Sequence, residues 1–433
     1  MSHTANLSAI GKLEIGAETE FGDEAAGANY TYLRTMPIDR SSLTVTSFRD
    51  EHQRQLDVET SKIIGPHTGS LSIQSYLHGF SSTVPAAAPT HTATNDNGAN
   101  GFDFIIDILA GALGNVHTGG FTDAEAGSTT SVLKLNGTTL ANGQFVAWQD
   151  SNSTWHVNSV QSQDLGPNPD EFTLLQTATA VPANGKVWGA HTIFQTTDAP
   201  FFDGTVKGFS LRYTGAGADD RTVMLGCWPS SLSMELPVGE LPTMSVDFMV
   251  SHWREDALAS NLGIHSGVGA DNGGLSSSEA WAFPTCEAVT QAHVSLGSSQ
   301  ADERQVQGIS FDLGLEIAPI KDANASSGIG GFFVVKRTPK ITLTMMRDVS
   351  EEITDFFNQT GRTLTCWAGS QAGRLIALQM PNAKIEEGPA PSDTDGAVMS
   401  QITFIANEYT SDGGDVSGTD NVPGDKVMKI GFI

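Results

Sequence analysis

Residues 380–406, MPNAKIEEGPAPSDTDGAVMSQITFIA, alternate apolar and polar side chains, break at a turn, and then alternate again. Alternation with a period of two is typical of half-buried strands, whereas Pro, Gly, Asp and Ser favour turns. The stretch therefore predicts a hairpin with strands at 380–387 and 397–406. Its turn region carries the acids Glu386, Glu387, Asp393 and Asp395. Because no His or Cys accompanies these acids at catalytic spacing, we expect a structural role for the hairpin.

The composition of the whole chain also favours β structure. The chain has 433 residues, which is enough for two or three domains. It contains 46 Gly and 18 Pro, and only 17% of its residues are charged. Long solvent-facing helices need more Lys, Glu and Arg than this, whereas strands joined by many turns do not. We therefore expect a mainly β fold.

The net charge of −26, from 49 acids against 23 bases, limits the possible partners. Proteins that grip nucleic acid need clustered Lys and Arg to neutralise phosphates. An acidic surface is instead one to which nucleic acid does not adhere. A cationic ligand, a bound metal and simple solubility are the other interpretations of this charge.

Neither a cofactor nor a metal site is predicted from the sequence motifs. The three cysteines, Cys227, Cys286 and Cys366, are too widely spaced for a zinc site or a disulfide framework. The chain has no P-loop, no Rossmann fingerprint and no G-x-S-x-G or H-E-x-x-H motif. It shows no signal peptide and no apolar run of the ~18 residues that a membrane helix needs. We expect folding in a reducing cytoplasm, no membrane contact and no enzymatic activity.

Two short helices are expected to flank the strands. Residues 102–114, FDFIIDILAGALG, show helical periodicity and end at a Gly-Asn stop. A second helix is expected at 350–360, where Ser350 is a good N-cap followed by acids. The residues expected to pack these helices against the sheet are Ile105, Ile106 and Leu109 in the first, and Phe356 and Phe357 in the second.

The same unit occurs twice along the chain. Each half gives strands, a helix, and then an apolar strand with a Pro, a turn and a further strand; Pro229 in the first half corresponds to Pro381 in the second. Such self-similarity suggests duplication. Residues 116–200 interrupt the first unit with short strands separated by Asn-Gly and Pro-rich turns, which predicts a small inserted β domain. The expected domains are therefore 1–115 with 201–255, the insert 116–200, and 256–433.

Four stretches in this order resemble the tail tube (major tail) proteins of long-tailed, non-contractile bacteriophages. Residues 18–45, ETEFGDEAAGANYTYLRTMPIDRSSLTV, are similar to the opening of that family. Residues 49–74 resemble its R-D-E segment followed by a polar strand. The helix at 102–114 and the hairpin at 380–406 resemble its A-L-G helix and its closing hairpin. The resemblance covers nearly the whole chain except the insert and the C-terminal tail.

The resemblance implies a duplicated β-sandwich or barrel tube domain with short flanking helices and the insert on the outside. It implies homotrimeric rings of pseudo-sixfold symmetry, with hexameric rings as the alternative, stacked into a tube in the virion after assembly in the host cytoplasm. Phage DNA would pass through the tube without specific binding, and the partners would be tape-measure and tail terminator or tip proteins. The acids expected to face the channel are Asp50, Glu51, Asp57 and Glu59. The acids of the 380–406 hairpin would face a neighbouring subunit or ring.

Three alternatives remain open at this stage. Trp148, Trp155 and Trp188 in the insert could form a carbohydrate-stacking face of a host-surface adhesin, although such residues are more often core. A β-rich hydrolase would need a pair of acids within ~5–10 Å of each other. Another tail or baseplate ring protein would share most of these features.

Overall fold

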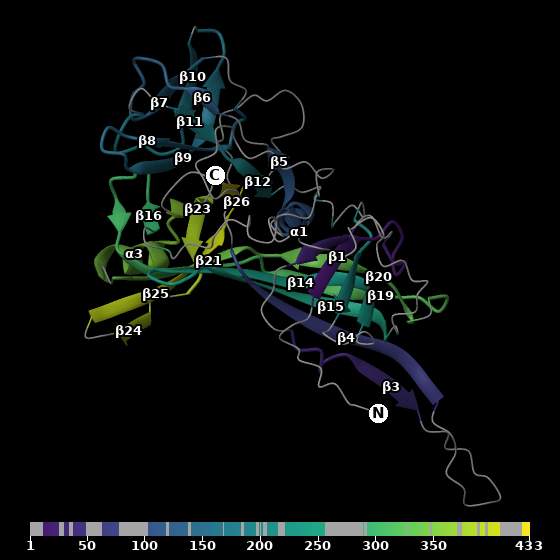
Figure 1. Ribbon diagram of the computed structural model, residues 1–433. Coiled ribbons are helices and arrows are strands. Elements are labelled where there is room, and N and C mark those ends of the chain that lie inside the picture. The colour runs from purple at the N-terminus through teal and green to yellow at the C-terminus, as the bar shows by residue number, and fades with distance from the viewer. Residues whose placement is uncertain are drawn as a thin grey trace, which may run out of the picture.

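The computed structural model (Figure 1) has strands through most of its length. The residues that it describes are 12–25, 30–33, 38–48, 63–77, 103–117, 121–136, 140–167, 169–182, 186–195, 199, 201, 206–214, 221–255, 289, 292–325, 327–346, 349–369, 375–387, 390–394, 397–407 and 427–433.

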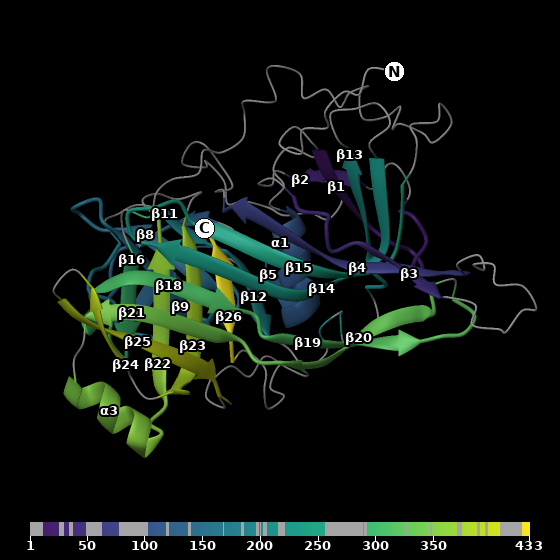
Figure 2. The same ribbon diagram turned by 90° about the horizontal axis from the view of Figure 1, so that it is seen from below.

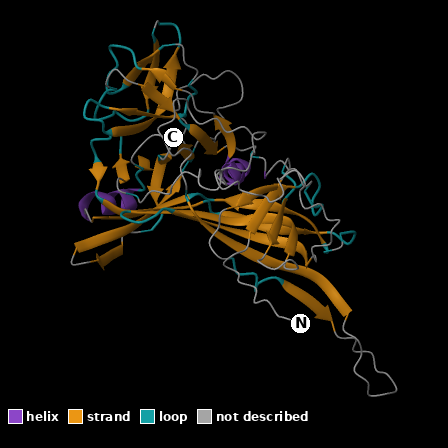
Figure 3. Cartoon of the chain, viewed as in Figure 1, coloured by secondary structure: helices purple, strands orange, loops and turns teal. Residues whose placement is uncertain are grey.

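The prediction of a mainly β fold is confirmed, since strands dominate the described residues and only two helices occur there (Figure 3). The first half contributes β1 (Lys12–Ala17), β2 (Tyr30–Leu33), β3 (Thr44–Phe48), β4 (Ile63–Tyr76), α1 (Asp103–Leu113), β5 (Gly114–His117), β12 (His191–Gln195), β13 (Phe209–Thr214), β14 (Arg221–Pro237) and β15 (Thr243–Glu255). The second half contributes β16 (Ala292–Leu296), β17 (Glu303–Arg304), β18 (Val306–Asp312), β19 (Leu315–Lys321), β20 (Ile329–Arg337), β21 (Lys340–Met346), α3 (Val349–Asn358), β22 (Arg362–Ala368), β23 (Ile376–Ile385), β24 (Ala390–Thr394), β25 (Ala397–Ala406) and β26 (Lys429–Phe432).

Strand β15 shows how the sequence pattern produces the core. Its residues Met244, Val246, Phe248 and Val250 are buried and alternate with partly exposed residues. Successive side chains of a strand point to opposite faces, so this alternation places one face of the sheet on the core. These four residues belong to a large cluster of buried apolar side chains that contains residues from both halves of the chain.

The hairpin at 380–406 has one strand more than predicted. Its two main strands are β23 and β25, which pair antiparallel at 383–385 and 404–406. The segment expected to be a turn contains β24, which pairs with residues 397–401 of β25. Local turn propensity was overridden here because the long strand β25 offers backbone partners beyond the end of β23.

The insert forms its own six-stranded sheet in the order β6–β11–β8–β9–β10–β7. Its strands are β6 (Phe121–Asp123), β7 (Val132–Leu135), β8 (Phe145–Gln149), β9 (Trp155–Asp164), β10 (Asp170–Leu174) and β11 (Lys186–Gly189). The predicted boundaries, 116–200, are too wide. Strands β5 and β12 pair with each other, and β12 also pairs with β26 of the large sheet.

The insert packs on the second half of the chain, although it arises from the first (Figure 1). Phe145 and Trp188 share a buried cluster with Trp367 of β22 and Ala377 of β23. Polar contacts support this arrangement, because the Ser159 hydroxyl donates a hydrogen bond to Gln379 Oε1 at 2.6 Å. The insert therefore bridges to the second half.

The two helices match their predicted positions but not all of their predicted contacts. Leu109 of α1 is fully buried in the main core, and Phe356 of α3 packs against the same core. Ile105 and Ile106 lie in α1, but their side chains are outside the described part of the structure. The prediction for Phe357 is wrong, since its side chain is 77% exposed. Helix α3 turns Phe356 inward, and the next residue lies about 100° further round the helix.

The last strand, β26, lies between β12 and β23. A Cβ atom built on Gly431 would lie 2.5 Å from the ring of Phe145 in the insert. Glycine at this position therefore allows the last strand to lie directly on the insert.

We expect Gly431→Ala to reduce the free energy of unfolding by about 1–3 kcal/mol, because the added methyl group overpacks this contact. Gly308→Ala is the matched control, since a Cβ there meets no atom closer than 3.9 Å. Chemical denaturation of both variants measures the difference. Equal stability of the two would contradict the tight contact.

Candidate assembly interface

The two halves of the chain have the same strand order. In the described residues, the first half runs β2–β1–β13–β14–β15–β4–β3 across the sheet. The second half runs β17–β16–β22–β23–β25–β21–β18. Corresponding strands also follow the same order along the chain, and every pairing is antiparallel. This agreement of topology goes beyond the chemical similarity of two Pro- and Gly-containing turns.

Other features occupy corresponding places in the two halves. Helix α1 follows β4, and helix α3 follows β21, the strand in the corresponding position. Pro229 lies at a shift of register between β14 and β15. Pro381, expected to be its counterpart, lies between the two β23 residues that flank a register shift with β22. Proline fits such points because its missing N–H removes one ladder hydrogen bond.

The halves are joined edge to edge by β14 and β18. Residues 233–235 of β14 pair with β15 on one edge, and residues 233–237 pair with residues 308–312 of β18 on the other. Both halves therefore lie in one continuous sheet, seen edge-on in Figure 1 and from below in Figure 2. This pairing is the junction between the halves.

Each strand that corresponds to a junction strand has a stretch of edge along which no described strand pairs. Strand β23 corresponds to β14, and its residues 384–385 pair with β25 while no other described strand lies on their opposite edge. Strand β3 corresponds to β18, and its one described neighbour is β4. An edge of this kind can add a strand from another chain through main-chain hydrogen bonds.

A hairpin of the second half, β19 and β20, reinforces the junction. It packs over the first half, where Phe332 contacts Phe21 with ring centroids 5.8 Å apart in an edge-on arrangement. Arg337 Nη1 donates hydrogen bonds to the carbonyl oxygens of Ala112 at 2.6 Å and Leu113 at 3.0 Å. These carbonyls end α1 and have no partner within the helix, so the guanidinium caps them.

A glycine in the sequence marks the start of this hairpin. Gly314 adopts a φ of +60° just before β19. A Cβ atom there would lie 2.1 Å from the carbonyl oxygen of Thr338, which leads into β21. Only glycine fits this close approach. Gly314 follows the alternating strand β18, and the hairpin leaves the sheet at this point.

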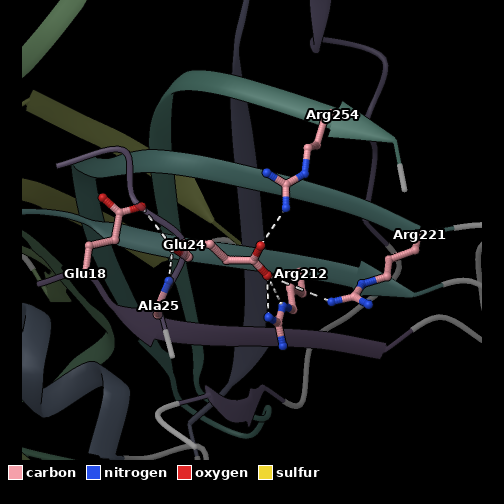
Figure 4. Close-up of polar contacts among 7 residues, drawn as sticks. Glu18, Glu24, Ala25, Arg212, Arg221 and Arg254 are labelled. Carbon is pink, nitrogen blue, oxygen red and sulfur yellow. Dashed lines mark hydrogen bonds and ion pairs between the residues drawn. The ribbon is translucent and has the colours of Figure 1, made fainter. Parts of the chain in front are cut away.

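A group of arginines holds the loop after β1 onto the first half (Figure 4). The Glu24 carboxylate accepts hydrogen bonds from Arg212 Nε at 2.8 Å and from Arg254 Nη2 at 2.6 Å. Arg221 lies 4.0 Å from the same carboxylate. Burial alone would raise the pKa of Glu24, but the hydrogen bond and charge of Arg212, aided by Arg254 and Arg221, lower it below 4.5. The loop is thereby fixed to β13, β14 and β15.

Glu18, at the start of the same loop, is buried, and its carboxylate is held by backbone N–H groups and a hydroxyl group. It accepts hydrogen bonds from Gly22 N, Ser210 Oγ and Gly226 N at 2.7–2.9 Å. Burial raises the pKa of Glu18, and these hydrogen bonds only partly oppose that rise. The carboxylate is therefore fully engaged in positioning the loop (Figure 4).

The acids predicted as functional fall into three groups. Asp50, Glu51, Asp57, Glu59 and Asp395 lie outside the described residues. Asp393 lies in β24, but its side chain is outside the described part as well. Glu386 forms an ion pair with Lys340 of β21 at 2.7 Å, and Glu387 is exposed. Glu386 therefore has an ion-pair partner within its own chain.

The tryptophans of the insert do not form an exposed stacking face. Trp148 and Trp155 are at most 3% exposed, and Trp188 is 8% exposed. A small cavity of ≈ 200 Å³ lies between the insert and the second half, next to His156, His293 and Glu303. The ring of His293 stacks on Trp367 with centroids 4.0 Å apart, so this tryptophan is also covered.

Within the described ranges, no three His, Cys, Asp or Glu side chains gather as metal ligands would. Neither of the two described helices has the length and apolar character needed to cross a membrane. Comparison of the chain with protein-family models gives no match, and no curated protein is significantly similar to it.

We expect Glu24→Gln to reduce the free energy of unfolding by about 2 kcal/mol at neutral pH, because it removes the charge that three arginines share. A carboxyl with a lowered folded pKa stabilises the fold above its ordinary value of 4.5. This contribution is lost as the pH falls through the lowered folded value. The difference between variant and wild type should therefore be constant from about pH 6 to 8 and shrink in acid.

Urea denaturation across this pH range provides the measurement. Glu171→Gln serves as the control, because Glu171 pairs with Lys134 at 2.9 Å on the surface and should contribute about 0.5 kcal/mol or less. A Glu24→Gln difference no larger than that of the control would contradict the role of the cluster.

Proposed function

We propose that the protein is a structural component of a bacteriophage tail, and that it polymerises into stacked rings that form the tail tube. The observation that carries this proposal is the repeated strand order of the two halves together with their edge-to-edge junction. The strands that correspond to β14 and β18 are β23 and β3. If β23 of one copy pairs with β3 of the next copy, the junction between the halves is repeated between copies. Such a head-to-tail contact closes into a ring when its rotation is a whole fraction of a turn.

Three copies per ring follow from two tube units in each chain. A homotrimer then presents six similar units around the channel, which gives pseudo-sixfold symmetry. The domains proposed are the two units and the insert, with the insert on the outside of the ring. Hexameric rings of this chain are the alternative arrangement.

The charge of the chain supports the passage of DNA through such a ring. Duplex DNA carries about one negative charge per ~1.7 Å of its axis, so a channel lined by Lys and Arg would retain it. A chain with a net charge of −26 favours an acidic wall that repels the phosphates. Asp50, Glu51, Asp57 and Glu59 are the residues that we propose for this wall.

The proposed setting is the virion, after assembly in the host cytoplasm. The partners would be further copies of the chain, a tape-measure protein that sets tube length, and terminator or tip proteins that cap the ends. DNA would pass without specific binding. A baseplate ring protein remains a second candidate, because a single ring would use the same junction.

The test is electron microscopy of the concentrated protein, with mass measurement of the isolated rings. Stacked rings with an open channel and three chains per ring are the expected result. Six chains per ring would overturn the trimer but keep the tube, whereas single unstacked rings would favour the baseplate alternative. Dispersed monomers, even with a tape-measure protein present, would contradict the proposal.

A further inference from the structure

The last strand, β26, continues the path of β25 along one edge of β23 (Figure 1). Ala406, at the end of β25, lies opposite Ala383 of β23. Lys429, at the start of β26, lies opposite Gln379, which is four residues earlier in β23. Strand β22 occupies the other edge of β23 along residues 376–383, so β25 and β26 share the same edge. Both pair antiparallel with β23, and together they form one interrupted strand.

The first unit has an uninterrupted strand in the corresponding place. When β14 is aligned with β23 through their corresponding prolines, Ser231 and Cys227 take the places of the two β23 residues just named. Their partners in β15 are Asp247 and Val250, which are only three residues apart in one continuous strand. Strand β15 therefore corresponds to β25 followed by β26.

Many more residues connect β25 with β26 than the gap between them requires. Residues 380–382 of β23 separate the two partner positions, a distance of ~13 Å at the rise of a strand. The connection has 22 residues, 407–428, which could span about 70 Å when extended. Residues 408–426 lie outside the described part of the structure, and their sequence, EYTSDGGDVSGTDNVPGDK, has the polar, Gly-rich composition of a linker.

Strand β26 lies in a slot with a strand on each side. It pairs with β12 on one edge and with β23 on the other, and residues 427–433 are all buried. Both walls of the slot belong to parts of the chain that precede the connection. The same hydrogen bonds and apolar contacts therefore form whether β26 comes from the same chain or from another copy, as in domain swapping.

The length of the connection favours a strand from another copy. A strand that stays in its own chain needs only a direct connection, as β15 shows. The local concentration of a tethered strand falls roughly as the −3/2 power of linker length, so 22 residues in place of three lower it about 20-fold at its own slot. In a closed ring, every β26 that leaves one slot can enter the slot of a neighbour, and no slot stays empty.

We propose that β26 of one copy fills the slot between β12 and β23 of a neighbouring copy in the ring. The inference rests on the proposed ring, and it adds an exchanged strand to the edge pairing between copies. Three exchanged strands would tie the three copies of a ring to one another in a closed circle. Residues 408–426 are then the segment that crosses from one copy to the next.

The first test joins β26 to its slot by a disulfide. Leu375 and Ile433 exchange both of their main-chain hydrogen bonds at 3.0–3.1 Å. The next opposed pair, Ile376 and Phe432, is therefore of the closely spaced kind, with Cα atoms ~4.5 Å apart, which suits a disulfide. Both residues are replaced by cysteine in one chain.

The double variant is made in a Cys286→Ser background, since Cys227 and Cys366 are buried. After assembly and oxidation, the protein is analysed on a denaturing gel without reductant. Exchanged strands should link the chains into covalent trimers. Strands that stay in their own chains would give monomers, each with an internal disulfide.

A shortened chain without residues 408–426 is the matched control. The deletion joins Asn407 to Val427 and leaves three residues opposite 380–382, as the geometry of a continuous strand requires. Its β26 can reach only its own slot, so the same pair of cysteines should give monomers alone. Thermal unfolding of the shortened chain and of the double variant checks that each is folded.

A second measurement needs no new cysteine. Rings of the shortened chain should dissociate on dilution at a protein concentration at least tenfold higher than wild-type rings, because they lack the exchanged strands. Sedimentation velocity over a dilution series measures the difference. Equal dissociation of the two would contradict the exchange even if the cysteine variant did not fold.

The outcomes separate this inference from the proposed function. Rings whose disulfides all lie within single chains would overturn the exchange and leave the tube proposal intact. Covalent trimers that never stack would support the exchange and count against the tube. Covalent trimers of the shortened chain would overturn the role of residues 408–426, and a wild type that forms no oligomer would overturn both proposals.

Discussion

The main-chain pairing of β14 with β18 fixes how the two halves of the chain lie relative to each other. Residues 233–235 pair on both edges of β14, with β15 and with β18, and this places similar units side by side in one sheet. Backbone hydrogen bonds define register and direction, so the second unit cannot rotate freely about the first.

Among the described residues, three of the contacts that join the halves differ in kind. The strand pairing joins elements that occur in both units, and the β19–β20 hairpin is described in the second unit. The third contact, between the insert and β22, β23 and β26, involves a domain that the second unit lacks. Contacts of the first kind can be repeated between copies, whereas the insert has no counterpart in the second unit. The strand pairing can therefore serve as a model for the contact between copies, whereas the insert contact cannot.

The buried charges of the first unit serve the fold. Glu24 and Glu18 both hold one short loop, the first by arginine charges and the second by backbone and hydroxyl donors. Their pKa values shift in opposite directions because only Glu24 has cationic neighbours. Such perturbed carboxyls commonly indicate a catalytic site. Here each is accounted for by a structural contact.

The sequence by itself determined the mainly β class, both helices and the two main strands of the 380–406 hairpin, because period and turn chemistry are local properties. It also indicated a duplication, through Pro229 and Pro381. Only the tertiary structure decided which edges pair, that residues 390–394 form a strand, that β12 leaves the insert, and that Phe357 faces solvent. Alternation identifies the buried face of a strand, but it carries no information on the neighbour across the hydrogen bonds. That neighbour depends on contacts between residues far apart in the chain, such as β14 with β18.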